Sequence, residues 1–544
     1  MLPISSDSRS ALMLGIRSLG LVVPLGLMVV GGHAASAQTS TDLPPGAREE
    51  WAVEKLVGFG LIDDRVFAVR PWSRGEVARL LGLARERLPG LGDEEREAAE
   101  AILATVAGRD LAARLRLEGI IGGSLLDSPW LPVPEDTGMG AIDAEVNHLV
   151  RYRGGRDYVD GQMLGGELAL DGVLGDHLAA QVQPRLWVGR GAGAGLDGGQ
   201  LVRGHARLQR SNLRLDVGRS SSVWGPGRDG GTLLAGNAPG LDRIRVSSDS
   251  PFRWPGFLSA LGPTQAEVFI ALLEERRDIP RSKLVGYNVS IRPHPLVEAW
   301  FATLIQSGGR GSPTAGAWER IADHLLFIDW IFNGGETFLF SNKGTSLGMR
   351  VRVPRLRHSQ LFAEFTLEDK GHNPRRIFWQ DGAWLVGVWV PRLDAVGTHD
   401  LRVELHHSGY RMHRHGQFTS GRTVDRRLLG MGDVNSDGGF VEVATNRRGL
   451  RFSLQLGVEN RSADVWDTRF RADGELDFLE KVDDRPDELY LRGLASVRAF
   501  GDGGRELVVG IGLARVSDSR FVEGAVRHDG ILEISGRVPI LSRD

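Results

Sequence analysis

A two-residue alternation of apolar and polar side chains runs from about residue 113 to the end of the chain and constrains the fold more than any other feature. Neighbouring side chains of an extended chain point to opposite faces, so each run predicts a β-strand with one apolar face. The apolar members of the clearest runs are Val285, Tyr287, Val289 and Ile291; Leu361, Ala363, Phe365 and Leu367; Leu401, Val403 and Leu405; Leu450, Phe452, Leu454, Leu456 and Val458; and Leu532, Ile534, Val538 and Ile540. The pattern predicts an all-β region.

The runs are about 8–11 residues long, which suits strands that cross a membrane better than the shorter strands of soluble sheets. Turn signals separate the runs, for example Arg292–Pro295, Gly308–Gly309, Asn333–Gly335 and Gly501–Gly504. Alternation alone leaves two folds open, a soluble sandwich with an apolar core and a membrane barrel with an apolar outer face. At roughly 20–25 residues for a strand and its loop, the region would supply about 16–20 strands, and a closed barrel leaves no unpaired edge in lipid.

The N-terminus has the features of an export signal. Arg9 and Arg17 accompany an apolar run from Leu19 to Val30, and Ala35-Ser36-Ala37 supplies a small-residue cleavage site. These features predict a signal peptide over residues 1–37. An uncleaved transmembrane anchor is the alternative, which the shortness of the apolar run disfavours. Export, long strands and unbroken alternation together favour an antiparallel outer-membrane barrel.

Helical spacing predicts a small α-helical domain over residues 38–112, before a barrel over residues 113–544. Ser73 and Glu76 have the spacing of a capping box, which satisfies free N–H groups in the first turn of a helix. The apolar stripe that follows consists of Val77, Leu80, Leu81, Ala84 and Leu88. A further helix is expected to begin near Asp93. In an exported barrel protein, this domain would lie in the periplasm.

Composition excludes several classes of function. The chain has 66 Lys and Arg against 69 Asp and Glu, a net charge of −3, which gives no support for nucleic-acid binding. It has no cysteine, so disulfides, thiolate catalysis and cysteine zinc sites are excluded. Phosphate-loop, G-x-S-x-G and H-E-x-x-H motifs are missing. We therefore predict a protein that is not an enzyme and has no cofactor.

Several tryptophans fall near predicted strand ends, where an aromatic girdle would meet the membrane surface. They are Trp187, Trp300, Trp330, Trp379, Trp384 and Trp389. The alternative is that these rings pack in the interior of the protein. The chain ends in Leu541-Ser542-Arg543-Asp544, which departs from the terminal aromatic residue of many outer-membrane barrels.

One block of sequence is distinctive. Residues Ser222–Gly230 read SVWGPGRDG and are followed by Leu233-Leu234, Asn237-Ala238-Pro239 and Ile244-Arg245-Val246. This stretch resembles the signature region of the capsule-assembly Wzi family, and the resemblance extends from about residue 48 to 540. It implies an outer-membrane barrel of about 18 strands with an N-terminal periplasmic helical bundle. It also implies a lectin-like protein that binds or anchors capsular polysaccharide.

The same block supplies candidate ligand-binding residues, Trp224, Arg228 and Asp229. Pro226 fixes its backbone φ while the adjacent glycines permit tight turns, so the block predicts a compact loop that folds into the lumen. A direct contact between Trp224 and a sugar is the alternative. Further candidate ligand-binding residues are Asn237, Arg350, Arg352 and Arg402.

The candidate arginines share predicted lumen faces with carboxylates, which are Glu364, Glu368 and Glu404. Mutual ion pairing is the favoured interpretation. Arginines left unpaired near the outer rim would suit an acidic polysaccharide, because guanidinium groups bind carboxylates bidentately. Two of the carboxylates could in principle form a glycosidase pair.

Two clusters resemble metal sites without matching one. The histidines His406, His407, His413 and His415 have no strict zinc spacing and lie among arginines. Residues Asp433–Gly438 read D-x-N-x-D-G, the first half of a calcium loop, but the twelfth position is Ala444 and not the required Glu. We predict no metal site; calcium near Asp433 is left open, with a polar turn favoured.

The preferred function is an outer-membrane, lectin-like protein that binds or anchors capsular or extracellular polysaccharide. The alternatives are a porin or polysaccharide export channel, and a barrel enzyme that acts on lipid or glycan. The expected partners are polysaccharide and outer-membrane lipid, with peptidoglycan or periplasmic export components as further candidates and no nucleic acid. We expect a monomer.

Overall fold

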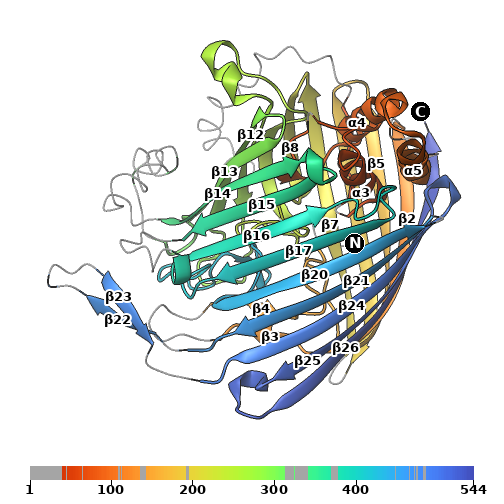
Figure 1. The fold of residues 1–544 in the computed structure, drawn as a ribbon. Helices are drawn as coiled ribbons and strands as arrows, with labels where there is room; N and C mark the ends of the chain where they lie inside the picture. The colour runs from red at the N-terminus through yellow and green to blue at the C-terminus, as the bar shows by residue number, and fades with distance from the viewer. Residues whose placement is uncertain are drawn as a thin grey trace, which may run out of the picture.

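A computed structural model describes residues 39–543 except 45, 64, 108–110, 112, 135–141, 192–194, 313–315, 317–323, 325–340, 369–377, 448, 465, 471, 473–475 and 482–484. The predicted signal peptide, Asn333–Gly335 and Trp330 therefore lie outside the described residues. Figure 1 gives the arrangement of the labelled helices and strands.

Within the described residues, 18 antiparallel strands form a closed barrel in which each strand pairs with the next along the chain (Figure 1). The first strand, β2, pairs with the last, β26, and so closes the barrel. The strands are β2 (Leu115–Asp127), β5 (Gly161–Leu174), β6 (Leu178–Gly191), β7 (Gly195–Arg210), β8 (Leu213–Ser220), β10 (Leu241–Ser248), β11 (Thr264–Leu272), β12 (Lys283–His294), β13 (Val297–Ser307), β14 (Ser341–Val353), β15 (Ser359–Leu367), β16 (Gly382–Val390), β17 (His399–Ser408), β20 (Ser436–Arg447), β21 (Leu450–Arg461), β24 (Glu488–Phe500), β25 (Glu506–Ser517) and β26 (Val526–Arg543). The predicted fold class and strand number are confirmed.

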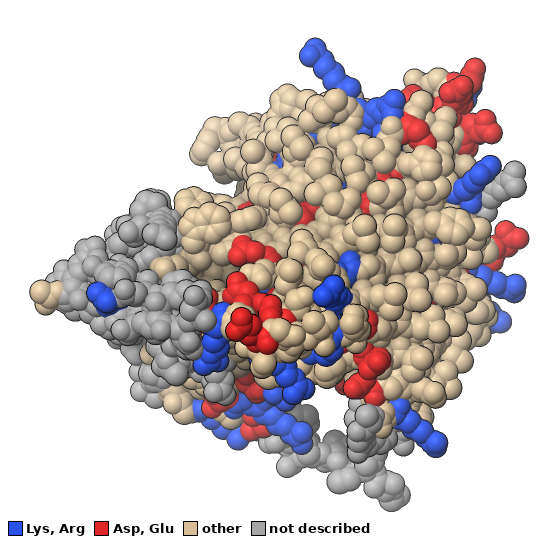
Figure 2. Space-filling view, turned by 60° about the horizontal axis from the view of Figure 1, so that its bottom comes forward, with Lys and Arg blue, Asp and Glu red and all other residues tan. Residues whose placement is uncertain are grey.

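The alternating runs place apolar side chains on the outer face of the barrel. On β21, Leu454 and Leu456 are 50% and 58% exposed, whereas Glu459, on the opposite face, is 1% exposed. A soluble sandwich would show the reverse, with the apolar face buried. Figure 2 shows charged side chains at the right-hand end and in a belt beside the grey segments, with mostly other residues between them. This outer surface is that of a barrel that spans a membrane.

The two ends of the barrel differ in the length of their connections. At one end, which we call the short-turn end, the connections are brief, such as residues 175–177 between β5 and β6. At the other, the long-loop end, they include residues 128–160, 221–240 and 409–435. Both the first and the last barrel strand have their outer ends, Leu115 and Arg543, at the short-turn end.

Three helices precede the barrel and pack at its short-turn end (Figure 1): α3 (Arg48–Val57), α4 (Arg74–Arg87) and α5 (Asp93–Thr105). Lys55 of α3 donates to the carbonyl oxygens of Pro391 and Gly397 and to Asp400, at the β16–β17 turn. No helix in the described part of the chain has the length and apolar content needed to cross a membrane.

The cap of α4 forms only in part. The Ser73 hydroxyl accepts a hydrogen bond from the Glu76 N–H at 3.2 Å, as predicted. The Glu76 carboxylate, in contrast, does not return to the helix start but pairs with Arg65 at 3.1 Å and Arg79 at 2.7 Å. Both Ser73 and Glu76 are buried, so the site offers the carboxylate two guanidinium partners instead of solvent.

Four short antiparallel pairs lie outside the barrel wall. They are β1 (Val69–Arg70) with β9 (Val223–Trp224), β3 (Leu131–Pro132) with β4 (Glu145–Val146), β18 (Thr423–Val424) with β19 (Arg427–Leu428), and β22 (Trp466–Phe470) with β23 (Leu476–Lys481). The pair of β1 and β9 joins the segment before α4 to a connection that begins at the opposite end of the barrel.

The predicted aromatic girdle is right for some tryptophans and wrong for others. Trp384 lies on the outer face of β16 and contacts Trp379, which is 55% exposed. Trp187, Trp300 and Trp389 are 8%, 3% and 6% exposed and face the lumen. The reason is their position in the alternation, because each occupies the polar phase of its strand.

We predict that Leu456→Arg, on the outer face in the middle of β21, lowers the free energy of unfolding by about 2–4 kcal/mol in lipid vesicles. The reason is that the charge would have to enter the hydrocarbon layer. Urea unfolding of the refolded protein would measure the loss. Ser453→Arg, on the lumen face of the same strand, serves as the control, and an equal loss in both variants would contradict the membrane assignment of this face.

Candidate functional site

The connection between β8 and β10, residues 221–240, folds into the barrel, and we call it the luminal segment. Its strand β9 pairs with β1, which approaches from the helices at the short-turn end. The Gly225 N–H donates to the Ala68 carbonyl at 2.9 Å, and Arg70 donates to the carbonyl oxygens of Gly227 and Arg228. Two chain segments therefore meet and pair inside the lumen.

Trp224 fixes the luminal segment to the wall. The residue is 1% exposed, and its indole N–H donates to Glu267 at 3.2 Å. Its ring lies 5.5 Å from that of Phe269, over Gly286, where a Cβ atom would come within 2.8 Å of the indole. This placement agrees with the predicted compact luminal loop. It leaves no indole face of Trp224 open to a sugar.

Carboxylates of the lumen wall accept hydrogen bonds from the backbone of this inserted chain. Glu364 accepts from the Thr232 N–H at 2.6 Å and from the indole N–H of Trp300 at 2.9 Å. Glu404 accepts from the Arg228 N–H at 2.8 Å. Glu298 accepts from the N–H groups of Phe67 and Ala68, just before β1. Two of the acidic residues considered for glycosidase chemistry, Glu364 and Glu404, thus have partners that position the luminal segment.

Two further loops cover the luminal segment on its long-loop side. The Ala235 N–H donates to Leu429 at 2.7 Å, and the Met431 N–H donates to Gly231 at 3.0 Å. Asn237, a candidate ligand-binding residue, is half-buried and donates to the Leu428 carbonyl at 3.1 Å. On another side, the Gly155 N–H of the β2–β5 loop donates to the Asn237 carbonyl. The described parts of loops 128–160 and 409–435 therefore pack against the luminal segment.

The acidic-polysaccharide hypothesis required arginines at the outer rim. The candidate arginines Arg350, Arg352 and Arg402 do not lie there. Arg350 and Arg352 are the tenth and twelfth residues of β14, which begins at the long-loop end and ends at the short-turn end. Arg402 is the fourth residue of β17, which runs the opposite way. All three therefore lie in the short-turn half of the lumen, on the far side of the luminal segment from the long loops.

Arg350 and Arg402 form the expected ion pairs with carboxylates, whereas Arg352 contacts a carbonyl oxygen. Arg350 donates to the Pro226 carbonyl at 3.4 Å and lies 3.8 Å from Glu298, and Arg402 lies 3.0 Å from Glu404. Arg352 donates to the Ile62 carbonyl at 3.2 Å. A cleft of about 340 Å³, counted with the solvent at its mouth, lies beside Arg350 and Arg402 and also includes Arg70 and Trp389.

Arg228 and Asp229 lie at the tip of the luminal segment, and Arg228 is the most exposed of the predicted ligand-binding residues. The Arg228 side chain is 42% exposed, although its guanidinium pairs with Glu442. Asp229 is partly exposed, and with Glu533 and Tyr158 it raises the pKa of Arg153 in the β2–β5 loop. The tip therefore faces an open, charged part of the lumen, where polar groups of a ligand could bind.

A buried cluster beneath the loops has the ligand types of a metal site, but arginines occupy it. His148, Asp433 and Glu459 offer atoms within 4.8 Å of one another. Arg461 lies 3.0 Å from Asp433, and Arg151 lies 2.6 Å from Glu459, so each carboxylate already has a cation. Burial and Arg151 hold the pKa of His148 well below its usual value. This cluster joins the two loops to the wall.

The predicted calcium half-loop and histidine cluster converge only in part. Asp433 points into the cluster above, whereas Asp437 pairs with His407 at 2.7 Å. His406 lies 3.8 Å from Glu459, and His413 is fully buried elsewhere in the loop. The structure therefore brings His406 and Asp433 to the same carboxylate, Glu459, and separates His407 and His413 from it.

The fold and its interior define a class of protein: a membrane-spanning β-barrel whose lumen is filled by its own loops. Residues 140–467, more than half of the chain, match the family described as capsule assembly protein Wzi. The chain therefore belongs to this family, and its fold is that of an outer-membrane β-barrel.

Two similar proteins illustrate the relationship. The Wzi structure from Escherichia coli, described as an outer-membrane protein of group 1 capsule assembly and a carbohydrate-binding barrel, has a TM-score of 0.64 at 15% identity, covering 92% of this chain and 100% of that one. An uncharacterized 55.8 kDa protein in the cps region of Klebsiella pneumoniae is 26% identical over 119 residues. That match spans 21% of this chain and about a quarter, 23%, of the relative.

We predict that acid loosens the 409–435 loop through His413. Burial lowers the pKa of this side chain to about 4, and no described residue forms a hydrogen bond with its ring. Because the folded pKa lies below the unfolded value of about 6.5, the neutral ring contributes stability above that pH, and the contribution is lost as the pH falls towards 4. The full effect is on the order of 3 kcal/mol.

Hydrogen–deuterium exchange of residues 409–435 at pH 7.5 and 4.5 would test this prediction. Lower protection factors, calculated against the slower intrinsic exchange in acid, are expected at pH 4.5 for the wild-type protein. A smaller change is expected for His413→Asn, since asparagine does not titrate and tolerates the positive φ of 65°. His415→Asn is the matched control. An identical acid response in His413→Asn and wild type would show that another group is responsible.

Proposed function

We propose that this protein is an outer-membrane, carbohydrate-binding barrel that retains capsular or other extracellular polysaccharide at the cell surface. Residues 1–37 act as a cleaved signal peptide in this proposal. The helices lie in the periplasm, because outer-membrane barrels place short turns there and long loops outside. The family membership supports capsule assembly as the process.

The observation that carries the proposal is the closed lumen. An open porin needs a continuous water path through the barrel. Here β1, the luminal segment and two further loops are linked by main-chain hydrogen bonds across the interior. Such a barrel is suited to hold a ligand, and the porin alternative finds no support in this interior. Among the described lumen residues named above, the carboxylates already have partners, so they offer no free acid–base pair for catalysis.

The polar tip of the luminal segment is the proposed contact for polysaccharide. Arg228 and Asp229 supply a guanidinium and a carboxylate that are partly exposed, and Asn237 adds an amide beside them. Planar polar groups of this kind bind the hydroxyl and carboxylate groups of sugars with defined geometry. The outer-membrane lipid surrounds the apolar face, and the protein acts as a monomer in this proposal. The helices would contact peptidoglycan or periplasmic export components.

We predict low ion conductance for the wild-type protein in planar bilayers, because the luminal segment and its covering loops block the path. Replacing residues 225–236 with a short Gly–Ser linker should give larger, stepwise conductance. A Gly–Ser replacement of Glu523 and Gly524, in the exposed β25–β26 loop, is the control. Wild-type conductance equal to that of the linker variant would favour the channel alternative.

We also predict that Arg228→Gln weakens the binding of purified capsular polysaccharide about tenfold, a loss of about 1.4 kcal/mol. The guanidinium is the exposed cation at the tip of the luminal segment. Immobilised polysaccharide and detergent-solubilised protein would give the dissociation constant, and retention on cells would give the physiological effect. Arg515→Gln, on the outer face near the long-loop end, is the control. Equal binding by wild type and Arg228→Gln would remove the tip from the contact surface.

A further inference from the structure

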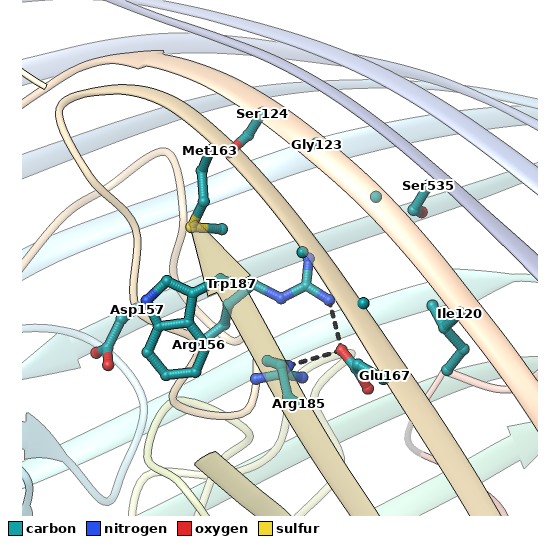
Figure 3. A pocket seen from close by; sticks show the side chains of 13 residues that line it. Ile120, Gly123, Ser124, Arg156, Asp157, Met163, Glu167, Arg185, Trp187 and Ser535 are labelled. Carbon is teal, nitrogen blue, oxygen red and sulfur yellow. Dashed lines mark hydrogen bonds and ion pairs between the residues drawn. The ribbon is translucent and has the colours of Figure 1, made fainter. Parts of the chain in front are cut away.

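A groove crosses the inner wall of the barrel where β26, β2, β5 and β6 lie side by side (Figure 3). One transverse row of lumen-facing positions forms its floor: Ser535 pairs with Gly122, Gly122 with Gly165, and Gly165 with Trp187. The groove holds about 420 Å³ of empty space, counted with the solvent at its mouth.

Missing side chains create the groove. Gly122 and Gly165 are neighbours across β2 and β5, so the wall carries no side chain at two adjacent lumen positions. A glycine in the interior of a strand weakens the strand and often marks a place where a ligand approaches the backbone closely. A Cβ atom at Gly165 would sit 3.2 Å from the Leu186 carbonyl oxygen and 3.5 Å from the Trp187 Cβ. The bare backbone therefore lies directly beside an indole.

Trp187 forms one end of the groove and has an unused donor. It is 8% exposed, and its indole nitrogen has no hydrogen-bond partner among the described residues. Buried indole N–H groups usually have an acceptor, because an unsatisfied buried donor costs about 1–3 kcal/mol. On the far side of the ring, Gly198 leaves space that a Cβ atom would fill at 2.8 Å from the indole. The indole nitrogen borders this same space, 3.2 Å from the position of that Cβ atom, so a ligand oxygen that enters it would satisfy the donor.

The side of the groove nearer the short-turn end carries an ordered polar array (Figure 3). Glu167 accepts from Arg156 at 3.0 Å and from Arg185 at 2.7 Å. Arg156 also reaches Glu533 at 3.2 Å, and Asp157 pairs with Arg427 at 2.9 Å. Each charge at the groove is therefore already matched by an opposite charge.

We propose that this groove binds one neutral pyranose residue of the polysaccharide, and the proposal rests on the proposed function. Sugar hydroxyls both donate and accept, so they can bind a carboxylate and a guanidinium that are already paired with each other. A ligand carboxylate would need an unpaired cation, and the groove residues named above supply none. The indole edge, the bare backbone and the Glu167 array together define a polar, one-sided pocket of this kind.

The 128–160 loop borders the groove on its long-loop side. Arg156 and Asp157 belong to the 128–160 loop, and Ser124 of β2 and Met163 of β5 lie between that loop and the groove floor. A polysaccharide outside the cell would therefore meet the loop first and place a residue beneath it. The Arg228–Asp229 tip lies near the same loop, because the charge of Asp229 is one of those that raise the pKa of Arg153. The groove extends the proposed contact at the tip onto the barrel wall.

The test uses detergent-solubilised mature protein and four probes: maltotriose, cellotriose and mannotriose as neutral saccharides, and a hyaluronan tetrasaccharide as the acidic one. Titration calorimetry would give the dissociation constants. Ser535→Leu fills the groove without altering a glycine, and Trp187→Phe removes the indole N–H but keeps a ring. Ser496→Leu, a lumen-facing serine on β24 outside the groove, is the matched control. Heat-modifiable migration on gels confirms that each variant is folded.

We expect at least one neutral trisaccharide to bind, with about tenfold weaker binding in Ser535→Leu, a smaller loss in Trp187→Phe and no change in Ser496→Leu. Binding of the acidic probe alone, binding of none of the neutral probes, or equal binding by Ser535→Leu and wild type would overturn the proposal. If cells with Ser535→Leu still retain capsular polysaccharide as the wild type does, the groove proposal is wrong while the proposed function stands. If the wild-type protein itself does not bind polysaccharide, the proposed function is wrong.

Discussion

The structure depends on one constraint: a peptide group that faces lipid must find its hydrogen-bond partner within the protein. A sheet meets this constraint only when its last strand returns to its first, as β26 does to β2. Closure dictates the alternation, because the outer face then meets hydrocarbon and every second side chain points inward. The polar side chains that a soluble protein would expose to bulk water are thereby collected in an interior.

That interior explains why the inserted chain is held by carboxylates. A barrel of this strand number is too wide for its wall side chains to fill, so other parts of the chain enter it. Glu298, Glu364 and Glu404 accept from the N–H groups of Ala68, Thr232 and Arg228, which lie outside the β1–β9 pair. Removing one of these acceptors would leave a buried donor unsatisfied, a cost of about 1–3 kcal/mol. The wall and its filling are therefore one polar network.

The alternation also sets how much of this arrangement the sequence could predict. The outer and inner faces of β12, β15 and β21 follow directly from it, and the capped helix at Ser73 follows from local spacing. Parity would also have placed Trp187 in the lumen, since it shares the phase of Arg185. Nothing local predicts that Val69 pairs with Trp224, because both belong to two-residue strands without periodicity. The position of Arg350 along the barrel axis likewise cannot be predicted from the alternation alone, because it depends on the direction in which β14 runs.

The same geometry indicates where a closed barrel can still bind a ligand. Long side chains and inserted loops fill the lumen wherever the wall carries large residues, as around Trp224 and Trp300. Space also remains where the wall is bare, and the pairing of Gly122 with Gly165 makes it bare over two strands. Glycine costs a strand stability, so such a pair beside an indole is hard to explain by packing alone. A barrel that is filled by its own loops keeps a polar interior, and a bare stretch of that interior is suited to recognise hydroxyl groups.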